Sequence, residues 1–167
     1  MIILFLDFDG VLHPPEVHNT HDAPELLTHG KIFMHARHLE DTLGYHPEVK
    51  IVLSTSWVSR MGYEATLSYM PAKLRARVVG TTWRESQQVG TYSFDSQDRM
   101  TRFQQIWSYV YSHQIKNWLA LDDLHSNTEQ WLSEHKNHLI LCNGKTGLGD
   151  AEVLAALNTA LLERQYG

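Results

Sequence analysis

The 167-residue sequence has one cysteine and no long apolar run. Cys142 therefore has no partner for a disulfide within the chain, which favours a reducing, cytoplasmic setting. A membrane-spanning helix needs about 20 consecutive apolar residues. The N-terminal apolar run ends at Asp7 and has no basic segment before it. We therefore expect neither a membrane anchor nor a signal peptide.

Positive charge is also scarce, since 14 Lys and Arg stand against 19 Asp and Glu, for a net charge of -5. Proteins that bind nucleic acid or anionic membranes over a wide area carry clustered basic residues. We expect no broad surface of that kind here, although a small basic patch at a site is compatible with this charge. The length suits one domain with its own core, and residues 1–167 are expected to form it.

Histidine, in contrast, is abundant, with 11 residues concentrated in the first third of the chain. His35 and His38 lie three apart on a predicted helix and can share a face. No HExxH or CxxC spacing accompanies them, so surface or loop histidines are favoured over a zinc site.

Apolar segments alternate with segments of helical spacing along the whole chain. This alternation predicts a parallel sheet of five strands with helices on both faces, an α/β fold of the Rossmann-like three-layer α/β/α type. The predicted strands are residues 2–7, 49–53, 77–80, 117–121 and 138–142. The predicted helices are residues 33–43, 62–70, 99–113, 126–135 and 150–163.

Polar residues stand directly after three of the predicted strands. In a parallel sheet the carboxyl ends of the strands meet at one edge, where ligands bind. We therefore expect these side chains to lie together and their carboxylates to need a cation between them. The residues concerned are Asp7 and Asp9 after the first strand, Ser54 and Thr55 after the second, and Asp122 and Asp123 after the fourth.

A site whose ligands are all oxygens, only a few of them from the protein, suits Mg2+. This ion keeps several bound waters and often takes a substrate phosphate as a further ligand. Asp7 and Asp122 are the first candidates for direct ligands, and the carbonyl of Asp9 is a further one. The Ser54 hydroxyl suits a phosphoryl oxygen. Either Arg102 or Arg99, near the start of the helix before the fourth strand, would balance the phosphate charge.

The strings "DFDGVL", "IVLST" and "LALDD", in this order, resemble the haloacid-dehalogenase-like (HAD) superfamily of phosphohydrolases with an aspartate nucleophile. The resemblance extends from residue 2 to about residue 150. It implies a Mg2+-dependent phosphatase that works through an aspartyl-phosphate. The roles that it implies are nucleophile for Asp7, general acid and base for Asp9, phosphate-binding hydroxyl for Ser54 with Thr55 as the second choice, and metal ligand for Asp122 with Asp123 in support. The third motif of the superfamily is usually a lysine, and here Arg102 stands in its place, with Arg99 as the alternative.

The strings "LSTSW", "RVVGTT" and "LDD" are similar to compact HAD domains, including those within multidomain RNA-repair proteins. About 40 residues separate the first two motifs, too few for a large cap. We expect a minimal cap or none, with short flaps over 13–30 and 81–98. An open site suits a bulky substrate such as a nucleic-acid end or a phosphoprotein, although small phosphometabolites and an oligomer that covers the site stay open.

Several residues near the motifs have two interpretations each. Gly10 lets the chain turn and approach a phosphate closely. His13 either contacts the substrate or is a loop histidine, and Arg60 either binds a substrate phosphate or is a surface charge. Trp57 and Trp83 either line a pocket or pack in the core, and we favour packing.

Two other functions compete with phosphatase activity. A signalling receiver domain also carries a phosphorylated aspartate on a five-stranded sheet. In a receiver domain, however, a pair of acidic residues follows the first strand, whereas the acidic pair here follows the fourth. The second rival is a HAD-fold module that binds Mg2+ and phosphate with little or no turnover, in an RNA-repair or other assembly. The presence of Asp7, Asp9, Ser54 and Asp122 together favours catalysis over this module.

Overall fold

The computed structural model describes residues 1–19, 24–83, 100–123 and 131–166. Within these ranges five strands form one sheet in the order β5-β4-β1-β6-β7, and every neighbouring pair is parallel. The predicted parallel sheet is thus confirmed. The strands are β1 (Ile2–Leu6), β4 (Val49–Leu53), β5 (Val78–Thr81), β6 (Trp118–Asp123) and β7 (Leu139–Cys142).

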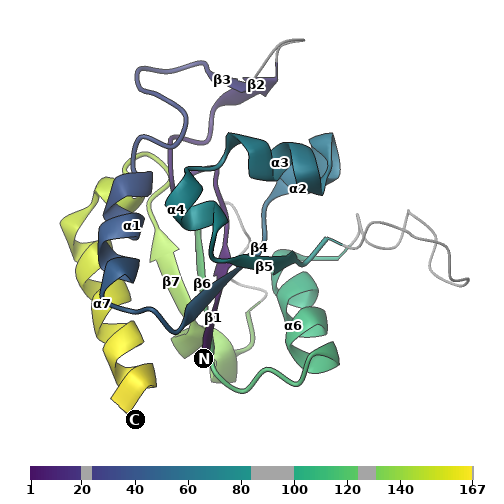
Figure 1. The fold of residues 1–167 in the computed structure, drawn as a ribbon, viewed down its shortest axis with the longest axis vertical. Coiled ribbons are helices and arrows are strands. Elements are labelled where there is room, and N and C mark those ends of the chain that lie inside the picture. Colours follow the sequence, from purple (N-terminus) through teal and green to yellow (C-terminus); the bar gives the residue numbers. More distant parts are fainter. Residues whose placement is uncertain (20–23, 84–99, 124–130, 167) are drawn as a thin grey trace, which may run out of the picture.

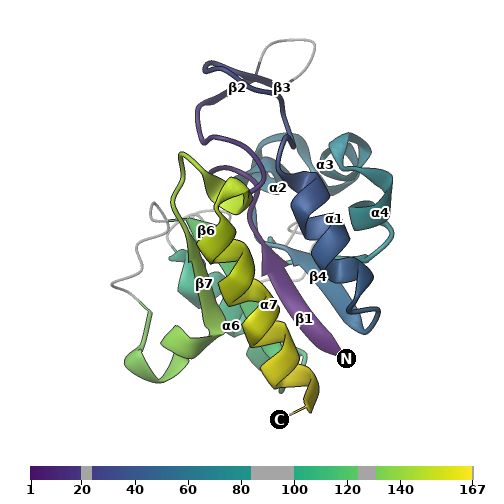
Figure 2. The ribbon, with the colours of Figure 1, turned by 90° about the vertical axis from the view of Figure 1, so that its left-hand side faces the viewer.

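Helices cover both faces of this sheet, as Figures 1 and 2 show. On one face lie α1 (Ala36–Gly44) and α7 (Ala151–Tyr166), and on the other lies α6 (Arg102–Ser112). Successive side chains of a strand point to opposite faces, so Leu4 of β1 belongs to the core cluster that includes helices α1 and α7, whereas Phe5 belongs to the cluster under α6. The three-layer α/β/α arrangement follows from this division.

The order of the strands reverses at β1, which lies between β4 and β6. In chain order the five strands run 3-2-1-4-5 across the sheet. A receiver domain has the order 2-1-3-4-5, so this topology excludes that rival. Ligands of such sheets bind beyond the carboxyl ends of the strands at the reversal, which is where β1 leads into Asp7.

The segment between β4 and β5 differs from the single helix predicted over 62–70. It forms α2 (Ser56–Met61), α3 (Tyr63–Tyr69) and α4 (Ala72–Arg75). Gly62, with φ of 90°, separates α2 from α3, and Pro71 precedes α4. The helical pattern before Gly62 was missed because α2 is short and begins at the end of the second motif.

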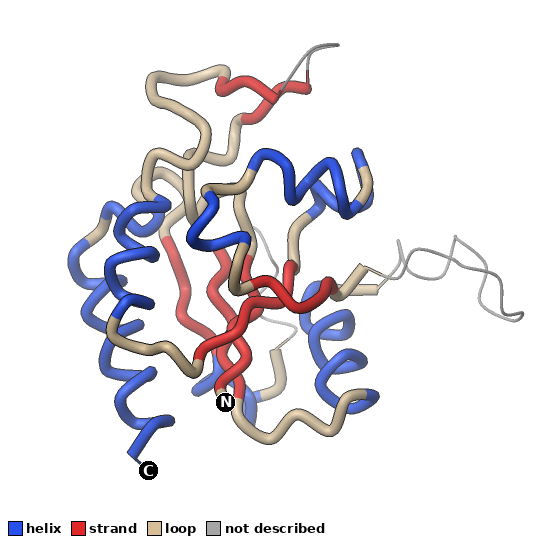
Figure 3. Tube along the Cα trace, in the orientation of Figure 1, coloured by secondary structure: helices blue, strands red, loops and turns tan. Residues whose placement is uncertain are grey.

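A two-stranded antiparallel sheet lies within the short flap predicted over 13–30. It pairs β2 (Val17–Asn19) with β3 (Pro24–Leu26) and projects from the main sheet beyond its carboxyl edge (Figures 1 and 3). This hairpin is the only sheet that the described residues insert between β1 and α1, so the cap at this position is minimal. The second predicted flap, 81–98, lies outside the described residues from 84 onwards.

The helix predicted over 126–135 also differs from the structure. Residues 124–130 lie outside the described ranges, and the chain beyond them forms a 3-10 helix, η3 (Ser133–His138), with β7 starting at the next residue. The rings of His135 and His138 pack against Trp118, with the His138 ring 4.1 Å from it between centroids. A second short 3-10 helix, η4 (Gly147–Gly149), precedes α7. Among the helices of the described residues, none is both long and apolar enough to span a membrane.

Candidate active site

Asp7, Ser54 and Asp122 lie side by side because the residues that precede them are aligned across three strands. Backbone bonds fix this edge: the Ser54 N–H donates to the Leu6 carbonyl at 2.8 Å, and the Asp7 N–H donates to the Leu121 carbonyl at 3.1 Å. The convergence expected from the sequence is therefore present. The aligned row consists of Leu6 in β1, Leu53 in β4 and Leu121 in β6.

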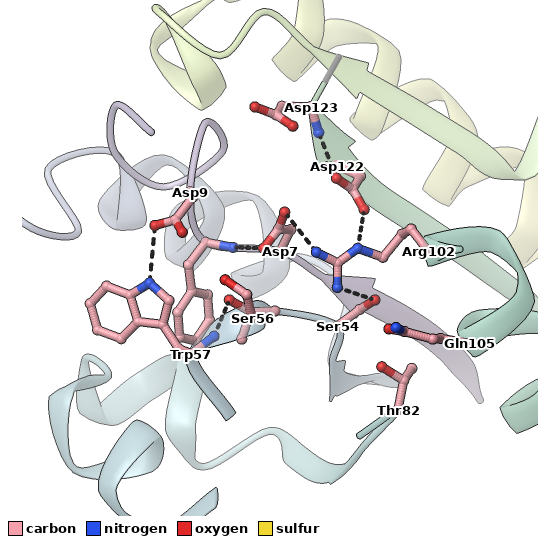
Figure 4. A network of polar contacts seen from close by, with 12 residues as sticks. Asp7, Asp9, Ser54, Ser56, Trp57, Thr82, Arg102, Gln105, Asp122 and Asp123 are labelled. Atoms are coloured by element: carbon pink, nitrogen blue, oxygen red, sulfur yellow. Dashed lines mark hydrogen bonds and ion pairs between the residues drawn. The ribbon is translucent and has the colours of Figure 1, made fainter. Parts of the chain in front are cut away.

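Arg102, the first residue of α6, reaches all three of these side chains (Figure 4). Its Nη2 lies 3.4 Å from Asp7 Oδ2, and its Nε lies 3.2 Å from Asp122 Oδ2. Its Nη1 donates to Ser54 Oγ at 3.4 Å. A capping box at Thr101, closed by Gln104, fixes where α6 begins. The alternative cation, Arg99, lies outside the described residues.

Burial dominates the electrostatics of this group. It raises the pKa of Asp7, with the neighbouring charge of Asp9 adding to the shift and Arg102 opposing it. The pKa of Asp122 is raised well above its ordinary value by burial and by the charge of Asp7. Burial alone would lower the pKa of Arg102, but the surrounding carboxylates outweigh it and raise that pKa. Several carboxyl groups thus face a single guanidinium, and when ionised they carry more negative charge than Arg102 can balance.

A metal ion fits this excess of negative charge. Asp7, Asp122 and Asp123 each offer an oxygen within 4.8 Å of the others, and all three residues are buried. Asp122 Oδ2 is buried and accepts no hydrogen bond from the described residues, although it pairs electrostatically with Arg102. Hard carboxylate oxygens of this kind suit Mg2+. The side chain of Asp9 is not part of this group of three.

Gly10 lets the loop after β1 lie against Asp123. Its φ is +75°, a conformation that side chains rarely adopt, and a Cβ there would overlap the Asp123 carboxylate. A Cβ on Gly144 would also lie 3.0 Å from Asp123 Oδ2. The loop after β7 is held in place by the Leu148 N–H, which donates to the Val11 carbonyl at 2.9 Å. Both glycines thus allow backbone to pack around one candidate metal ligand.

The carboxylate of Asp9 is held apart from the other acids by two donors, of which Figure 4 shows Trp57. Trp57 Nε1 donates to Asp9 Oδ1 at 3.0 Å, and His13 Nε2 lies 3.1 Å from the same oxygen. His13 is fully buried and Trp57 is 1 % exposed. The sequence predicted core packing for Trp57, which is confirmed, but its bond to Asp9 was missed because no local pattern links positions 9 and 57.

The remaining candidates occupy different places. Thr55 is the N-cap of α2 and accepts a hydrogen bond from the Trp57 backbone N–H at 3.4 Å. Arg60 is exposed in the last turn of α2, and in the described structure it bonds to none of the other candidate residues. Trp83 packs against the core cluster that contains Trp57. Of the two hydroxyls at the end of β4, Ser54 is the one that contacts Arg102.

Residues 3–153 match the model of a family described as the HAD domain in Swiss Army Knife RNA repair proteins. The match covers the sheet from the second residue of β1 onwards and every candidate residue named above. No curated protein and no solved structure matches the chain at a significant level.

Proposed function

The chain belongs to the family of HAD domains found in Swiss Army Knife RNA repair proteins, and we propose that it is a Mg2+-dependent phosphohydrolase with Asp7 as its nucleophile. One observation carries the proposal: Arg102 and the ends of three strands bring Asp7, Ser54 and Asp122 into one buried cluster. A structural ion pair needs one carboxylate for each cation, whereas this cluster holds three carboxylates around a single guanidinium.

In the first step an oxygen of Asp7 attacks the phosphorus of a phosphate monoester. The bond between phosphorus and the ester oxygen breaks, and a protonated Asp9 gives its proton to that leaving oxygen. Arg102 and the Ser54 hydroxyl donate hydrogen bonds to the phosphoryl oxygens, which stabilises the charge that spreads over them. The product of this step is an aspartyl-phosphate on Asp7 and a free alcohol.

In the second step water attacks the same phosphorus and loses its proton to the Asp9 carboxylate. The bond from phosphorus to Asp7 breaks, which releases inorganic phosphate and restores both aspartates to their starting states. When bound, Mg2+ supplies neutralisation of the charge between the Asp7 carboxylate and the phosphate. Asp7, Asp122 and Asp123 are the residues that would hold it.

The substrate that we propose is a phosphorylated RNA end, with small phosphorylated molecules as the alternative. The description of the family supports a nucleic-acid end. The small β2–β3 hairpin supports it too, because the described residues between β1 and α1 add only this small cap beside the carboxyl edge of the sheet.

The test of the activity is hydrolysis of p-nitrophenyl phosphate and of RNA oligonucleotides with a 3′- or 5′-phosphate, with and without Mg2+. We expect release of product that requires Mg2+ and is abolished by Asp7→Asn. Asp41→Asn, which changes an exposed acid paired with Arg37 on α1, is the matched control and should leave the rate unchanged. Equal and negligible rates for the wild type and Asp7→Asn on all substrates would contradict the proposal.

The role of Asp9 has its own test. Asp9→Asn should lower the rate by about 10²–10⁴-fold, because a positioned acid contributes that much. Mg2+ binding, measured by calorimetry, should change little, because the backbone carbonyl of residue 9 is retained. A large loss of Mg2+ affinity would show instead that the Asp9 side chain is a ligand.

The second candidate function is a module that binds Mg2+ and phosphate with little or no turnover, within an RNA-repair or other assembly. The buried cluster of Asp7, Asp122 and Arg102 would serve such binding equally well. Calorimetric binding of inorganic phosphate that depends on Mg2+, together with rates that Asp7→Asn leaves unchanged, would favour this function.

A further inference from the structure

Asp9 uses only one of its two carboxylate oxygens for contacts within the described part of the chain. Oδ1 accepts from Trp57 Nε1 at 3.0 Å and lies 3.1 Å from His13 Nε2, while Oδ2 bonds to none of the described residues. The Asp9 side chain is 18 % exposed, whereas His13 is completely buried. The two sides of the carboxyl group thus differ: one is anchored in the protein and the other is open.

The hydrogen on the His13 ring can be assigned from its second contact. The Phe33 backbone N–H donates to His13 Nδ1 at 3.2 Å, so this nitrogen acts as an acceptor and carries no hydrogen. The hydrogen of the neutral ring therefore lies on Nε2, which donates it to Asp9 Oδ1. Both contacts of Oδ1 are then N–H donors, and a carboxyl oxygen with two donors on it is not the one that carries a proton.

The anchor is built from segments that are far apart in the chain. Phe33 adopts φ of 59°, which is uncommon for a residue with a side chain and persists only where the surroundings enforce it. Its ring packs edge-on against Phe8 and His13, and Phe8 also packs edge-on against Trp57. Trp57 is held at its backbone as well, by the Thr55 cap of α2. Neither donor has room to turn away from Asp9.

We propose that His13 and Trp57 are positioning residues that fix the Asp9 carboxyl group, so that Oδ2 is the oxygen that exchanges protons with the substrate. This inference rests on the proposed function. In the first step the proton moves from Oδ2 to the leaving oxygen, and Oδ1 keeps both of its N–H donors. In the second step the attacking water returns a proton to Oδ2. His13 and Trp57 neither gain nor lose a proton in either step.

The primary test replaces Trp57 by phenylalanine, which keeps an aromatic ring and removes the N–H donor. Trp131→Phe is the matched control, because Trp131 is 2 % exposed and its indole nitrogen has no hydrogen-bond partner among the described residues. The readout is kcat/KM for p-nitrophenyl phosphate and for phenyl phosphate. Nitrophenolate leaves readily without a proton, whereas phenolate depends more strongly on the general acid.

With Trp57→Phe we expect kcat/KM for phenyl phosphate to fall about tenfold further than for p-nitrophenyl phosphate, as the loss of one hydrogen bond to a charged group predicts. Trp131→Phe should leave the ratio of the two values at that of the wild type. A purely structural role for Trp57 lowers both values by the same factor, and that outcome would overturn the inference.

A pair of variants at His13 gives the same test without Trp57, in case Trp57→Phe does not fold. The amide nitrogen of glutamine can take the place of Nε2 as a donor, whereas methionine offers none. We therefore expect His13→Gln to keep the wild-type ratio and His13→Met to increase the dependence on the leaving group. Equal ratios in the two variants would overturn the inference.

The proposed function fails in a different way from this inference. If the wild type hydrolyses neither ester in the presence of Mg2+, both the function and the positioning roles are overturned. If the wild type is active and each variant loses the same factor on both esters, the phosphatase stands and only the positioning roles fall.

Discussion

The guanidinium of Arg102 lies against the carboxylate of Asp7, with Nη2 3.4 Å from Oδ2, although 95 positions separate the two residues in the chain. The same guanidinium also contacts Asp122 through Nε and Ser54 through Nη1. A lysine ammonium is a single compact charge, whereas arginine presents several N–H groups in a fixed plane. One side chain thus connects the ends of three strands.

The first prediction concerns this planar group. Arg102→Ala should lower kcat/KM for p-nitrophenyl phosphate by about 10²–10³-fold, the usual loss when a donor to a developing charge is removed. Arg102→Lys should retain part of the activity, because the charge remains and the planar arrangement is lost. Arg37→Ala, an exposed arginine on α1, should leave the rate unchanged. A larger loss from Arg99→Ala than from Arg102→Ala would move the assignment to Arg99.

The second prediction couples Mg2+ to pH. The raised pKa values of Asp7 and Asp122 mean that the metal-free folded protein holds protons more tightly than the unfolded chain. Its stability therefore falls as pH rises from the ordinary carboxyl range through the raised values. Mg2+ binding would replace those protons, so the increase in Tm with Mg2+ should grow as pH rises above the ordinary carboxyl range.

Thermal unfolding with Mg2+ and with a chelator, at several pH values, measures this coupling. Asp122→Asn is the informative variant, because it removes one of the two buried carboxyl groups whose pKa is raised. It should raise the Tm of the metal-free protein at neutral pH and remove most of the shift with Mg2+. An increase in Tm with Mg2+ that is the same at every pH would contradict the raised pKa values.

The third prediction compares two glycines. Gly10→Ala should destabilise the protein by more than about 1 kcal/mol, because its φ is positive and its Cβ would overlap Asp123. It should also weaken Mg2+ binding, since Asp123 has to move. Gly44 lies in the last turn of α1, where an added Cβ would meet no atom within 4 Å. Gly44→Ala should therefore stabilise the protein by about 0.5–1 kcal/mol; urea unfolding measures both.

The fourth prediction concerns Arg77, which holds the connection between α1 and β4. Its guanidinium donates to the carbonyls of Leu43, His46 and Val49 at 2.6–3.1 Å. Arg77→Ala should lower the free energy of unfolding by about 2–4 kcal/mol, because three carbonyls lose a charged donor. Arg75→Ala, two residues earlier and exposed, should change it by less than about 0.5 kcal/mol. Urea unfolding that gives equal effects for the two would contradict this role.

Much of the fold could be predicted because the buried strands are mostly apolar runs that end in polar residues. The run "IILFL" is fully buried in β1, and Asp7 follows it at the edge of the sheet. The meeting of Asp7, Ser54 and Asp122 then follows from parallel pairing alone. The choice of Arg102 followed from its place at the start of a helix that packs on the same edge.

The environment of Asp9 could not be predicted in the same way. Its donors depend on a tertiary contact between the loop after β1 and α2, which no local periodicity records. For His13 the sequence left open a substrate contact or a loop histidine, and it gave no sign of the full burial that the structure shows. The contacts of η3 were missed for a similar reason, since the His138 ring stacks on Trp118 and the His135 ring packs tilted against it, far along the chain from any motif.

The place of β1 at the centre of the sheet has a consequence for local opening. All five of its residues pair with β4, and four of them also pair with β6 on the other side. Amide groups bonded in such a central strand exchange with solvent only when most of the molecule unfolds, whereas edge strands and hairpins open at a lower free-energy cost. The β2–β3 hairpin can therefore open and close many times while Asp7 stays on the segment of the chain that exchanges last.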